Sequence, residues 1–243
     1  MTTPDDINSD DHDLIATDLA AALGDVGQMA THGASIANVF SVLSTQCVHL
    51  LPIGAAGILL VDSTDALHAI GSSSHAAKFL DLFQAQNDEG PCRDCCRTKK
   101  TVICEDITKD SRWPNFASRA IAENFTAVYA LPLESQDVVV GALNLFSSTP
   151  LNPDQLLIAR SLADAATMVF LQADTQHDRL LIARKIRSAV EGRNAIEQAK
   201  GVLSERYGIS MMEAFWKLRD ASVARDMDIV DLATSVVNHE IQL

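Results

Sequence analysis

Four of the five cysteines lie close together in the sequence, and thiols are the side chains of this chain best suited to chemistry. The stretch "EGPCRDCC" (residues 89–96) contains Cys92, Cys95 and Cys96, and Cys104 follows shortly after it. On a helix that begins near Cys92, the three thiols of this stretch share one face. Such a group could bind a tetrahedral zinc ion or an iron–sulfur cluster, or respond to oxidants as a reactive thiolate.

Burial as small apolar side chains is the interpretation that we favour for these cysteines. An odd set of five argues against a disulfide framework, and free cysteine commonly packs as a small hydrophobe. Structural metal sites usually pair two Cys-x-x-Cys knuckles, whereas this chain has one, so we predict no metal site. Arg93, Arg97, Lys99 and Lys100 would lower the pKa of a nearby thiol, which leaves redox sensing open as a second interpretation.

The sequence outside the cysteines shows no catalytic signature. It has no Walker loop and no Gly-x-Ser-x-Gly, His-Glu-x-x-His or Gly-x-Gly-x-x-Gly motif. We therefore expect a protein that is not an enzyme, and the sequence identifies no cofactor.

Acidic residues are unevenly distributed along the chain. Residues 1–175 carry nine Lys and Arg against twenty-two Asp and Glu, whereas residues 176–243 carry ten against ten. This pattern indicates an acidic module followed by a neutral one, with any contact to a polyanion confined to the second. No apolar run is long enough to span a membrane, and the acidic N-terminus is unlike a secretory signal, so we expect a cytoplasmic protein with no membrane contact.

The first part of the chain predicts an α+β domain. Residues 1–11 are polar and acidic and are expected to be disordered, and two amphipathic helices separated near Gly33 should follow. Short β-branched runs predict strands, and a short polar gap should join the last two as an antiparallel hairpin. The expected strands are 55–63, 101–106, 126–135 and 137–148, and the helices between them are 75–86, 92–98 and 114–122.

A long helix is expected after this domain. Asn152 is a capping residue, Pro153 follows it, and Gln155 completes a capping box, so a helix should begin there and continue to Tyr207. A helix of this length should link two domains. Apolar residues in its second half alternate in steps of four and three, which predicts a coiled-coil seam and a homodimer. The seam positions are Ile182, Ile186, Ala189, Ile196 and Leu203.

Two basic residues, Arg193 and Lys200, share the register of the seam. Either their apolar stems pack while the charges reach outward, or the two residues are held on one face to contact phosphates. Gly208 should end the long helix, and Ser210 with Glu213 should cap the next one. A further helix follows, so the C-terminus is predicted to be a three-helix bundle.

Residues 193–222, and more loosely 179–239, resemble the ANTAR family of RNA-binding transcription antiterminators. The resemblance implies a dimeric three-helix module that binds paired hairpins in a nascent transcript and prevents a terminator from forming. The matching features are the Ala199-Lys200-Gly201 triplet, the Gly208-Ile209-Ser210 turn, the Glu213-Ala214-Phe215 step and Leu218-Arg219.

The residue types in this segment fit RNA binding. Phe215, Leu218 and Ala221 form the expected inward stripe of the second helix. Trp216 lies off that stripe, where it either stacks on an unpaired base or braces the bundle. Gly201 would permit close approach of another backbone or of RNA. The candidate RNA-binding residues are Arg193, Lys200, Arg206, Trp216, Lys217, Arg219 and Arg225.

Residues 33–172 resemble a GAF sensor domain of the kind joined to ANTAR modules in actinobacteria. The motifs that carry this resemblance are "EGPCRDCC", "RWPNFASRA", "YALPLES" and "GALNLFSS". It implies an antiparallel sheet flanked by helices and a sensor of a small molecule or redox state, whose identity the sequence does not give. The sensor candidates are Cys92, Asp94, Cys95, Cys96, Cys104 and Trp113.

The predicted organisation is a disordered tail (1–11), a GAF-like sensor domain with N-terminal helices (12–172), and a linker helix with an ANTAR RNA-binding domain (173–243). The expected function is a signal-responsive regulator that acts by transcription antitermination as a homodimer. The alternative is a protein-interaction signalling module whose helical C-terminus docks a protein partner.

Overall fold

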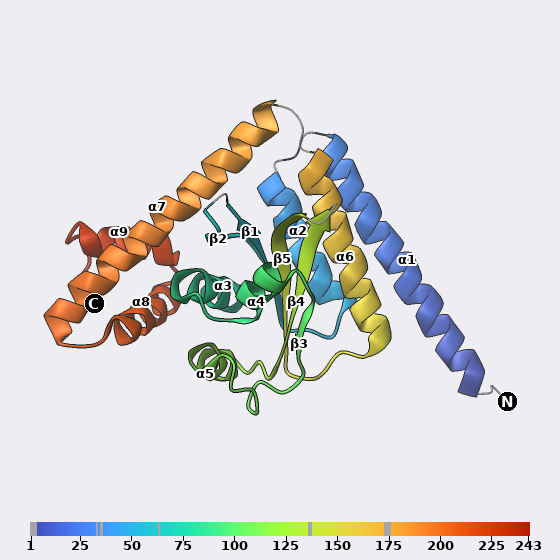
Figure 1. Cartoon of the computed structure of the whole chain (residues 1–243), viewed down its shortest axis with the longest axis horizontal. Coiled ribbons are helices and arrows are strands. Elements are labelled where there is room, and N and C mark those ends of the chain that lie inside the picture. Colours follow the sequence, from blue (N-terminus) through green and yellow to red (C-terminus); the bar gives the residue numbers. More distant parts are fainter. Residues whose placement is uncertain (1–3, 33, 35, 63, 136–137, 173–175) are drawn as a thin grey trace. The chain divides into compact units, whose positions relative to one another are not determined.

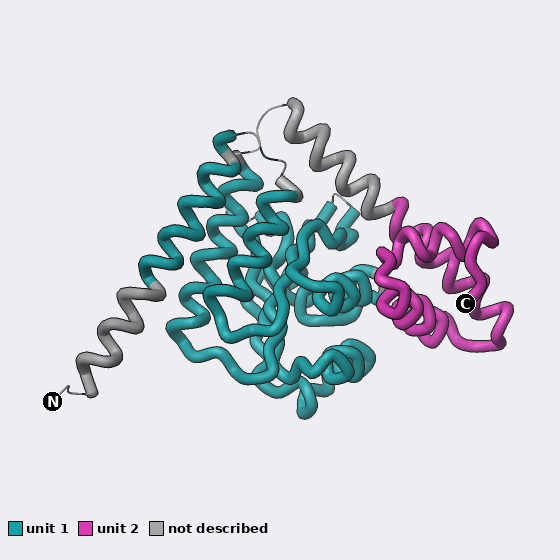
Figure 2. The backbone as a smooth tube through the Cα atoms, turned by 180° about the vertical axis from the view of Figure 1, so that it is seen from behind, with its two compact units in different colours: residues 1–185 teal, residues 186–243 magenta. Residues whose placement is uncertain are grey.

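The structure is a computed structural model that describes residues 4–32, 34, 36–62, 64–135, 138–172 and 176–243. For residues 4–15, 30, 36–37, 86, 172 and 176–190 it describes the secondary structure and not the side chains. The chain divides into two compact units, residues 1–185 (unit 1) and residues 186–243 (unit 2), which are described separately (Figure 2).

Unit 1 contains a five-stranded antiparallel sheet with the strand order β2-β1-β5-β4-β3 (Figure 1). The strands are β1 (Ala55–Val61), β2 (Leu67–Ser72), β3 (Val102–Cys104), β4 (Ala127–Ser135) and β5 (Val138–Ser147). The helices are α1 (Pro4–Thr31), α2 (Ile36–Leu50), α3 (His75–Asn87), α4 (Pro91–Thr98), α5 (Pro114–Ala122) and α6 (Pro153–Gln172).

Helices cover both faces of this sheet (Figure 1). On one face, α1, α2 and α6 enclose the main apolar core, in which Ile58, Tyr129 and Leu143 are buried. On the other face lie α3 and α4, with α5 beside α3. Because strand side chains alternate between faces, the neighbours Gly57 and Asn144 point toward α3. Burial on both faces explains why the strand sequences are nearly continuous apolar runs.

The predicted α+β class and the hairpin between the last two strands are confirmed. β4 pairs with β5 from Ala127 opposite Ser147 to Ser135 opposite Val138. Strand β2 was not predicted, because "LHAIGS" contains a histidine and a glycine in place of a β-branched run. The glycine has a packing reason: a Cβ on Gly71 would lie 2.9 Å from the backbone carbon of Phe40 in α2. A contact this close to a distant helix cannot be inferred from a local pattern.

The N-terminal tail differs from the prediction. Helix α1 begins at Pro4, so most of the segment 1–11 is helical in the structure and not disordered. The local sequence favours this start, because proline suits the first helical position and acidic residues such as Asp5 and Asp6 suit the first turn.

The start of the long helix agrees with the predicted capping box. The backbone N–H of Gln155 donates to Oδ1 of Asn152 at 2.9 Å, and the N–H of Asn152 donates to Oε1 of Gln155 at 2.9 Å. The predicted helix to Tyr207 is present as α6 and α7 (Gln176–Tyr207). The continuity of α6 and α7 depends on residues 173–175, which lie outside the described residues.

Two positions of the predicted seam are covered within the single chain. The side chains of Ile182, Ile186 and Ala189 lie outside the described residues. Ile196 and Leu203 are fully buried within the single chain. These last two positions therefore cannot form a surface seam in this conformation, because the three-helix bundle already covers them.

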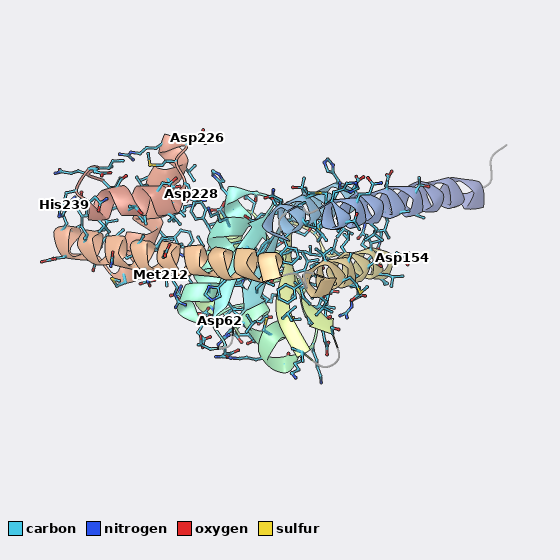
Figure 3. The ribbon with its side chains drawn as sticks, turned by 90° about the horizontal axis from the view of Figure 1, so that it is seen from above. Asp62, Asp154, Met212, Asp226, Asp228 and His239 are labelled. Carbon is cyan, nitrogen blue, oxygen red and sulfur yellow. The ribbon has the colours of Figure 1, made fainter. Side chains whose placement is uncertain are left out.

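Unit 2 contains the C-terminal part of α7, followed by α8 (Met211–Arg225) and α9 (Ile229–Val237). Gly208 has a φ of +63°, and Ser210 and Glu213 form the predicted capping box at the start of α8. Asp226 and Asp228, both labelled in Figure 3, lie in the connection to α9, where Oδ1 of Asp228 accepts the N–H of Val230 at 2.8 Å. The predicted three-helix bundle is present.

Replacing Asn152 with alanine should lower the free energy of unfolding of unit 1 by about 1 kcal/mol, because α6 then has no side-chain cap. The two tryptophans, Trp113 and Trp216, lie in different units, so urea unfolding of a Trp216→Phe background followed by Trp113 fluorescence reports on unit 1. An unchanged unfolding midpoint would show that this cap does not stabilise α6.

Candidate functional site

The stretch "EGPCRDCC" forms the entry to helix α4. Gly90 precedes the helix with a φ of +140°, and Pro91 takes its first position. The backbone N–H of Cys92 donates to Oε1 of Gln84 in α3 at 2.8 Å. A Cβ on Gly90 would lie 2.5 Å from Gln84, so the glycine leaves room for this buried amide. The start of α4 is therefore positioned by a side chain of α3.

The cysteines of this stretch differ in accessibility. Cys92 and Cys95 are fully buried, whereas Cys96 is half-buried and its thiol contacts that of Cys92. Cys104 is buried in β3, and Cys47 is buried in α2. Across the described residues, no group of three or more His, Cys, Asp and Glu side chains has an arrangement that could hold a metal ion.

Burial makes these thiols poor nucleophiles. It raises the pKa of Cys92 and of Cys95 well above the ordinary thiol value. Burial, with a hydrogen bond to Asp110, raises the pKa of Cys104 to about 11. At neutral pH these three side chains stay protonated, and the protonated thiol is the unreactive form.

The nearby arginines do not lower these pKa values as the sequence predicted. Arg93 donates to Oδ2 of Asp65 at 2.8 Å and forms a short ion pair with Asp88. Nη2 of Arg97 lies 2.6 Å from Oδ2 of Asp88. The positive charge of both arginines is therefore offset by carboxylates, and the side chains serve to connect α4 to neighbouring loops.

Two acidic residues of the stretch connect α4 to α5. The indole N–H of Trp113 donates to Oδ2 of Asp94 at 2.9 Å, and Trp113 is buried. Glu89 accepts the backbone N–H groups of Asn115 at 2.8 Å and of Phe116 at 3.0 Å. Glu89 thus supplies the hydrogen-bond acceptor that the first turn of α5 needs. The hydrogen bond between Asp94 and Trp113 therefore fixes these two predicted sensor residues against each other.

Sequence reasoning missed a buried carboxyl group on α3. Asp81 is fully buried, and Nδ2 of Asn144 in β5 donates to its Oδ1 at 2.8 Å. Its other oxygen, Oδ2, faces Gly57, where a Cβ would lie only 1.8 Å away. Burial raises the pKa of Asp81 well above its ordinary value. The signal in the sequence is a lone aspartate in the apolar run "KFLDLF", at a position that the helical period turns inward.

The candidate RNA-binding residues of α7 are not all on the surface. The side chain of Lys200 is only 8% exposed, and its Nζ lies 2.8 and 2.9 Å from the two carboxylate oxygens of Glu197. The prediction that Lys200 faces phosphates is therefore corrected, because the helix turns it inward beside Ala199 and its charge is paired. Arg193 is half-buried, and Arg206 is exposed.

The two glycines of α7 differ in what lies close to them. Apart from its chain neighbours and the nearby backbone of its own helix, none of the described atoms lies within 4 Å of a Cβ added to Gly201, so approach by RNA stays a prediction there. The close approach occurs at Gly192, where a Cβ would lie 3.0 Å from Val230 of α9. Gly192 therefore allows α9 to pack against α7.

The remaining candidates lie on or after α8. Phe215 and Leu218 are buried as predicted, and Ala221 is half-buried. Trp216 is half-buried and packs edge-to-face on Phe215, with ring centroids 5.1 Å apart. The candidate cations of this helix are Lys217 and Arg219, both half-buried, and Arg225, which is exposed.

One contact that sequence reasoning missed joins α8 to the end of α7. The ammonium of Lys217 lies 4.6 Å from the ring centroid of Tyr207. Tyr207 as a residue is 43% exposed.

Family models match both parts of the chain. A GAF domain model matches residues 33–170, which is more than half of the chain, and an ANTAR domain model matches residues 184–237. The chain belongs to the GAF domain family and carries an ANTAR domain. GAF domains are sensor domains and ANTAR domains are RNA-binding antitermination domains, so the chain combines the two parts of a regulator.

Solved structures agree with this assignment for the GAF fold. The GAF domain of an Acinetobacter phosphoenolpyruvate-protein phosphotransferase has 14% identity and a TM-score of 0.51, and the match covers 64% of this chain and 94% of that one. The corresponding Coxiella burnetii domain has 13% identity and a TM-score of 0.51, with coverage of 65% and 95%. At these identities the likeness concerns the fold alone. A comparison with curated proteins found no match.

GAF and ANTAR domains are regulatory domains. In the part of the chain that the structure describes, every helix is too short or too polar to cross a bilayer.

Proposed function

We propose that this protein is a cytoplasmic homodimer that regulates transcription antitermination in response to a signal. The GAF domain binds a small molecule, and the ANTAR domain binds paired hairpins in a nascent transcript. The observation that carries the proposal is the occurrence of both family matches on one chain, with the acidic residues concentrated away from the ANTAR segment.

The burial and the raised pKa values of the thiols favour a small-molecule signal over thiol oxidation. Cys92, Cys95 and Cys104 are buried with raised pKa values, which disfavours the thiolate that an oxidant attacks. Of the three thiols in residues 89–96, Cys96 is the one with partial access to solvent.

The homodimer is supported by apolar side chains on the surface of α6. Leu157, Met168 and Leu171 are 68%, 57% and 45% exposed, so they are available for an apolar contact with a second chain. The spacing from Met168 to Leu171 fits the three-residue step of a coiled-coil seam. Light scattering of the purified chain should give the mass of two chains, and a single-chain mass at micromolar concentration would contradict the homodimer.

Phosphate contacts are assigned to the accessible cations of the ANTAR domain. Arg206 and Arg225 are exposed and Arg193 is half-buried, whereas Lys200 is excluded by its burial. Arginine donors bind phosphate oxygens and release counterions, so affinity should fall as salt rises.

The double substitution Arg206→Ala with Arg225→Ala should weaken binding of an RNA with two adjacent hairpins. The slope of log K against log salt should fall by about one for each phosphate that the variant no longer binds. Gel-shift titrations at several salt concentrations measure both quantities. The matched control, Lys100→Ala with Lys109→Ala, removes two exposed cations from unit 1 and should leave the slope unchanged.

If the slope of log K against log salt is the same for the arginine double variant and the lysine double variant, RNA binding does not use Arg206 and Arg225. If no hairpin RNA binds the full chain at any salt concentration, with or without candidate ligands, antitermination by RNA binding is wrong. The helical C-terminus would then be better explained as a docking module for a protein partner.

A further inference from the structure

Tyr207 is an aromatic side chain placed at an exposed corner. It is the last residue of α7, and its side chain is 43% exposed. Its sequence neighbour Arg206 is exposed, and Lys217 of α8 lies over its ring at 4.6 Å from the centroid. This corner therefore combines an exposed aromatic residue with a cation from a second helix over its ring, next to the exposed Arg206.

The corner is held in place by hydrogen bonds on its C-terminal side. The N–H of Ile209 donates to the carbonyl of Ser204 at 3.2 Å, and Oγ of Ser204 donates to the carbonyl of Ile209 at 2.6 Å. The N–H of Ser210 donates to the carboxylate of Glu213 at 2.8 Å. These bonds fix the backbone of the turn between α7 and α8, so less backbone freedom has to be lost when this corner binds a ligand.

Trp216, the base-stacking candidate from the sequence, is less suited to this role. It is half-buried, and its ring packs edge-to-face on the buried Phe215. Trp216 therefore has less of its surface open to a base than the exposed Tyr207 has. Tyr207 lies at the end of a helix.

Building on the RNA-binding function proposed above, we propose that Tyr207 is the stacking platform for an unpaired base of the hairpin loop, and that Lys217 contacts the adjoining phosphate. Aromatic stacking of one base contributes about fivefold to a hundredfold in affinity. The contact between Lys217 and the ring, at an exposed site, contributes only about twofold to fivefold. A base can therefore displace the ammonium from the ring, and the released cation is then close enough to bind the phosphate of the same nucleotide.

The test uses the full chain and an RNA with two adjacent hairpins that carries 2-aminopurine at single loop positions. Tyr207→Leu should lower the affinity about tenfold and leave the salt slope unchanged, because no charge is removed. Tyr207→Phe should retain the affinity, since the ring and not the hydroxyl makes the contact. Lys217→Ala should lower the salt slope by about one. Binding to the unsubstituted chain should quench 2-aminopurine at one loop position, and Tyr207→Leu should abolish this quenching.

Met211→Ala is the matched control, because Met211 is also 43% exposed in the same unit. It should change neither the affinity nor the quenching. If the unsubstituted chain binds the RNA but Tyr207→Leu binds equally well, with the same quenching, the stacking role is wrong while RNA binding stands. If the unsubstituted chain binds no hairpin RNA, both the stacking role and the proposed function are wrong.

Discussion

Replacing Gly90 with alanine is expected to destabilise unit 1 by about 2–4 kcal/mol. Gly90 has a φ of +140°, a region that costs any other residue about 1–3 kcal/mol. The added Cβ would also lie 2.5 Å from the buried Gln84, whose amide oxygen accepts the N–H of Cys92. Losing that hydrogen bond costs about 1 kcal/mol more. Urea unfolding followed by Trp113 fluorescence in the Trp216→Phe background measures the change.

The matched control is Gly24→Ala in α1, where none of the described atoms beyond its chain neighbours and its own helix backbone lies within 4 Å of an added Cβ. This substitution should stabilise the helix by up to about 1 kcal/mol, because alanine has the higher helix propensity. A Gly90→Ala variant as stable as the Gly24→Ala variant would show that Gly90 and Gln84 do not determine the entry to α4.

Replacing Asp81 with asparagine is expected to stabilise unit 1 at neutral and alkaline pH. Burial raises the pKa of Asp81 above its unfolded value, so the folded protein holds this carboxyl group protonated. The stability that it contributes is complete below the unfolded pKa and is lost as pH rises from there through the folded pKa. Asparagine stays neutral at every pH and can still accept the 2.8 Å hydrogen bond from Asn144.

The unfolding free energy of Asp81→Asn should therefore exceed that of the unsubstituted protein by an amount that grows with pH. Between the unfolded and the folded pKa of Asp81, this excess should grow by up to about 1.4 kcal/mol for each pH unit. Unfolding free energies measured from about pH 4 to pH 9 provide the test. A difference that does not vary with pH would mean that Asp81 is ionised in the folded protein.

Asp62→Asn is the control, because the pKa of Asp62 is shifted in the opposite direction from that of Asp81. Partial burial of Asp62 works against ionisation, but hydrogen bonds from Thr64, His68 and the backbone hold its pKa well below the ordinary value. The carboxylate of Asp62, labelled in Figure 3, accepts the backbone N–H groups of Thr64 and Ala66 in the turn between β1 and β2. It also lies 2.7 Å from Nε2 of His68. Asp62→Asn should be destabilising throughout the range used for Asp81→Asn and should not vary with pH there, because the folded pKa of Asp62 lies below that range. The destabilisation should shrink only at lower pH, as the pH falls from the unfolded pKa through the folded pKa.

The elements predicted best are those that depend on residues close together in the sequence. The capping boxes at Asn152 and Ser210 and the left-handed Gly208 were all predicted, because each depends on residues only a few positions apart. The hairpin of β4 and β5 belongs to the same class, since a short polar gap joins two apolar runs. Strand β2 was missed because its glycine is explained by packing against α2, which is distant in the sequence.

The candidate sites depend on burial, and burial was predicted less well. The stretch "EGPCRDCC" was correctly placed at the start of a helix, but its arginines were expected to act on thiols and instead pair with Asp65 and Asp88. Those carboxylates lie in connections between elements, whose positions the one-dimensional pattern does not define. Lys200 was expected on a phosphate-binding face and is buried beside Glu197, because the packing of the bundle decides which side of α7 is covered.

The sequence by itself determined the two domain families, the local caps and the separation of charge between the two parts of the chain. The tertiary structure alone decided which thiols are protonated by burial, that Asp81 is enclosed between α3 and the sheet, and that Tyr207 and Lys217 meet at one corner. The physical reason is that local conformation follows from neighbouring residues, whereas the exposure and charge state of a side chain follow from everything that packs around it.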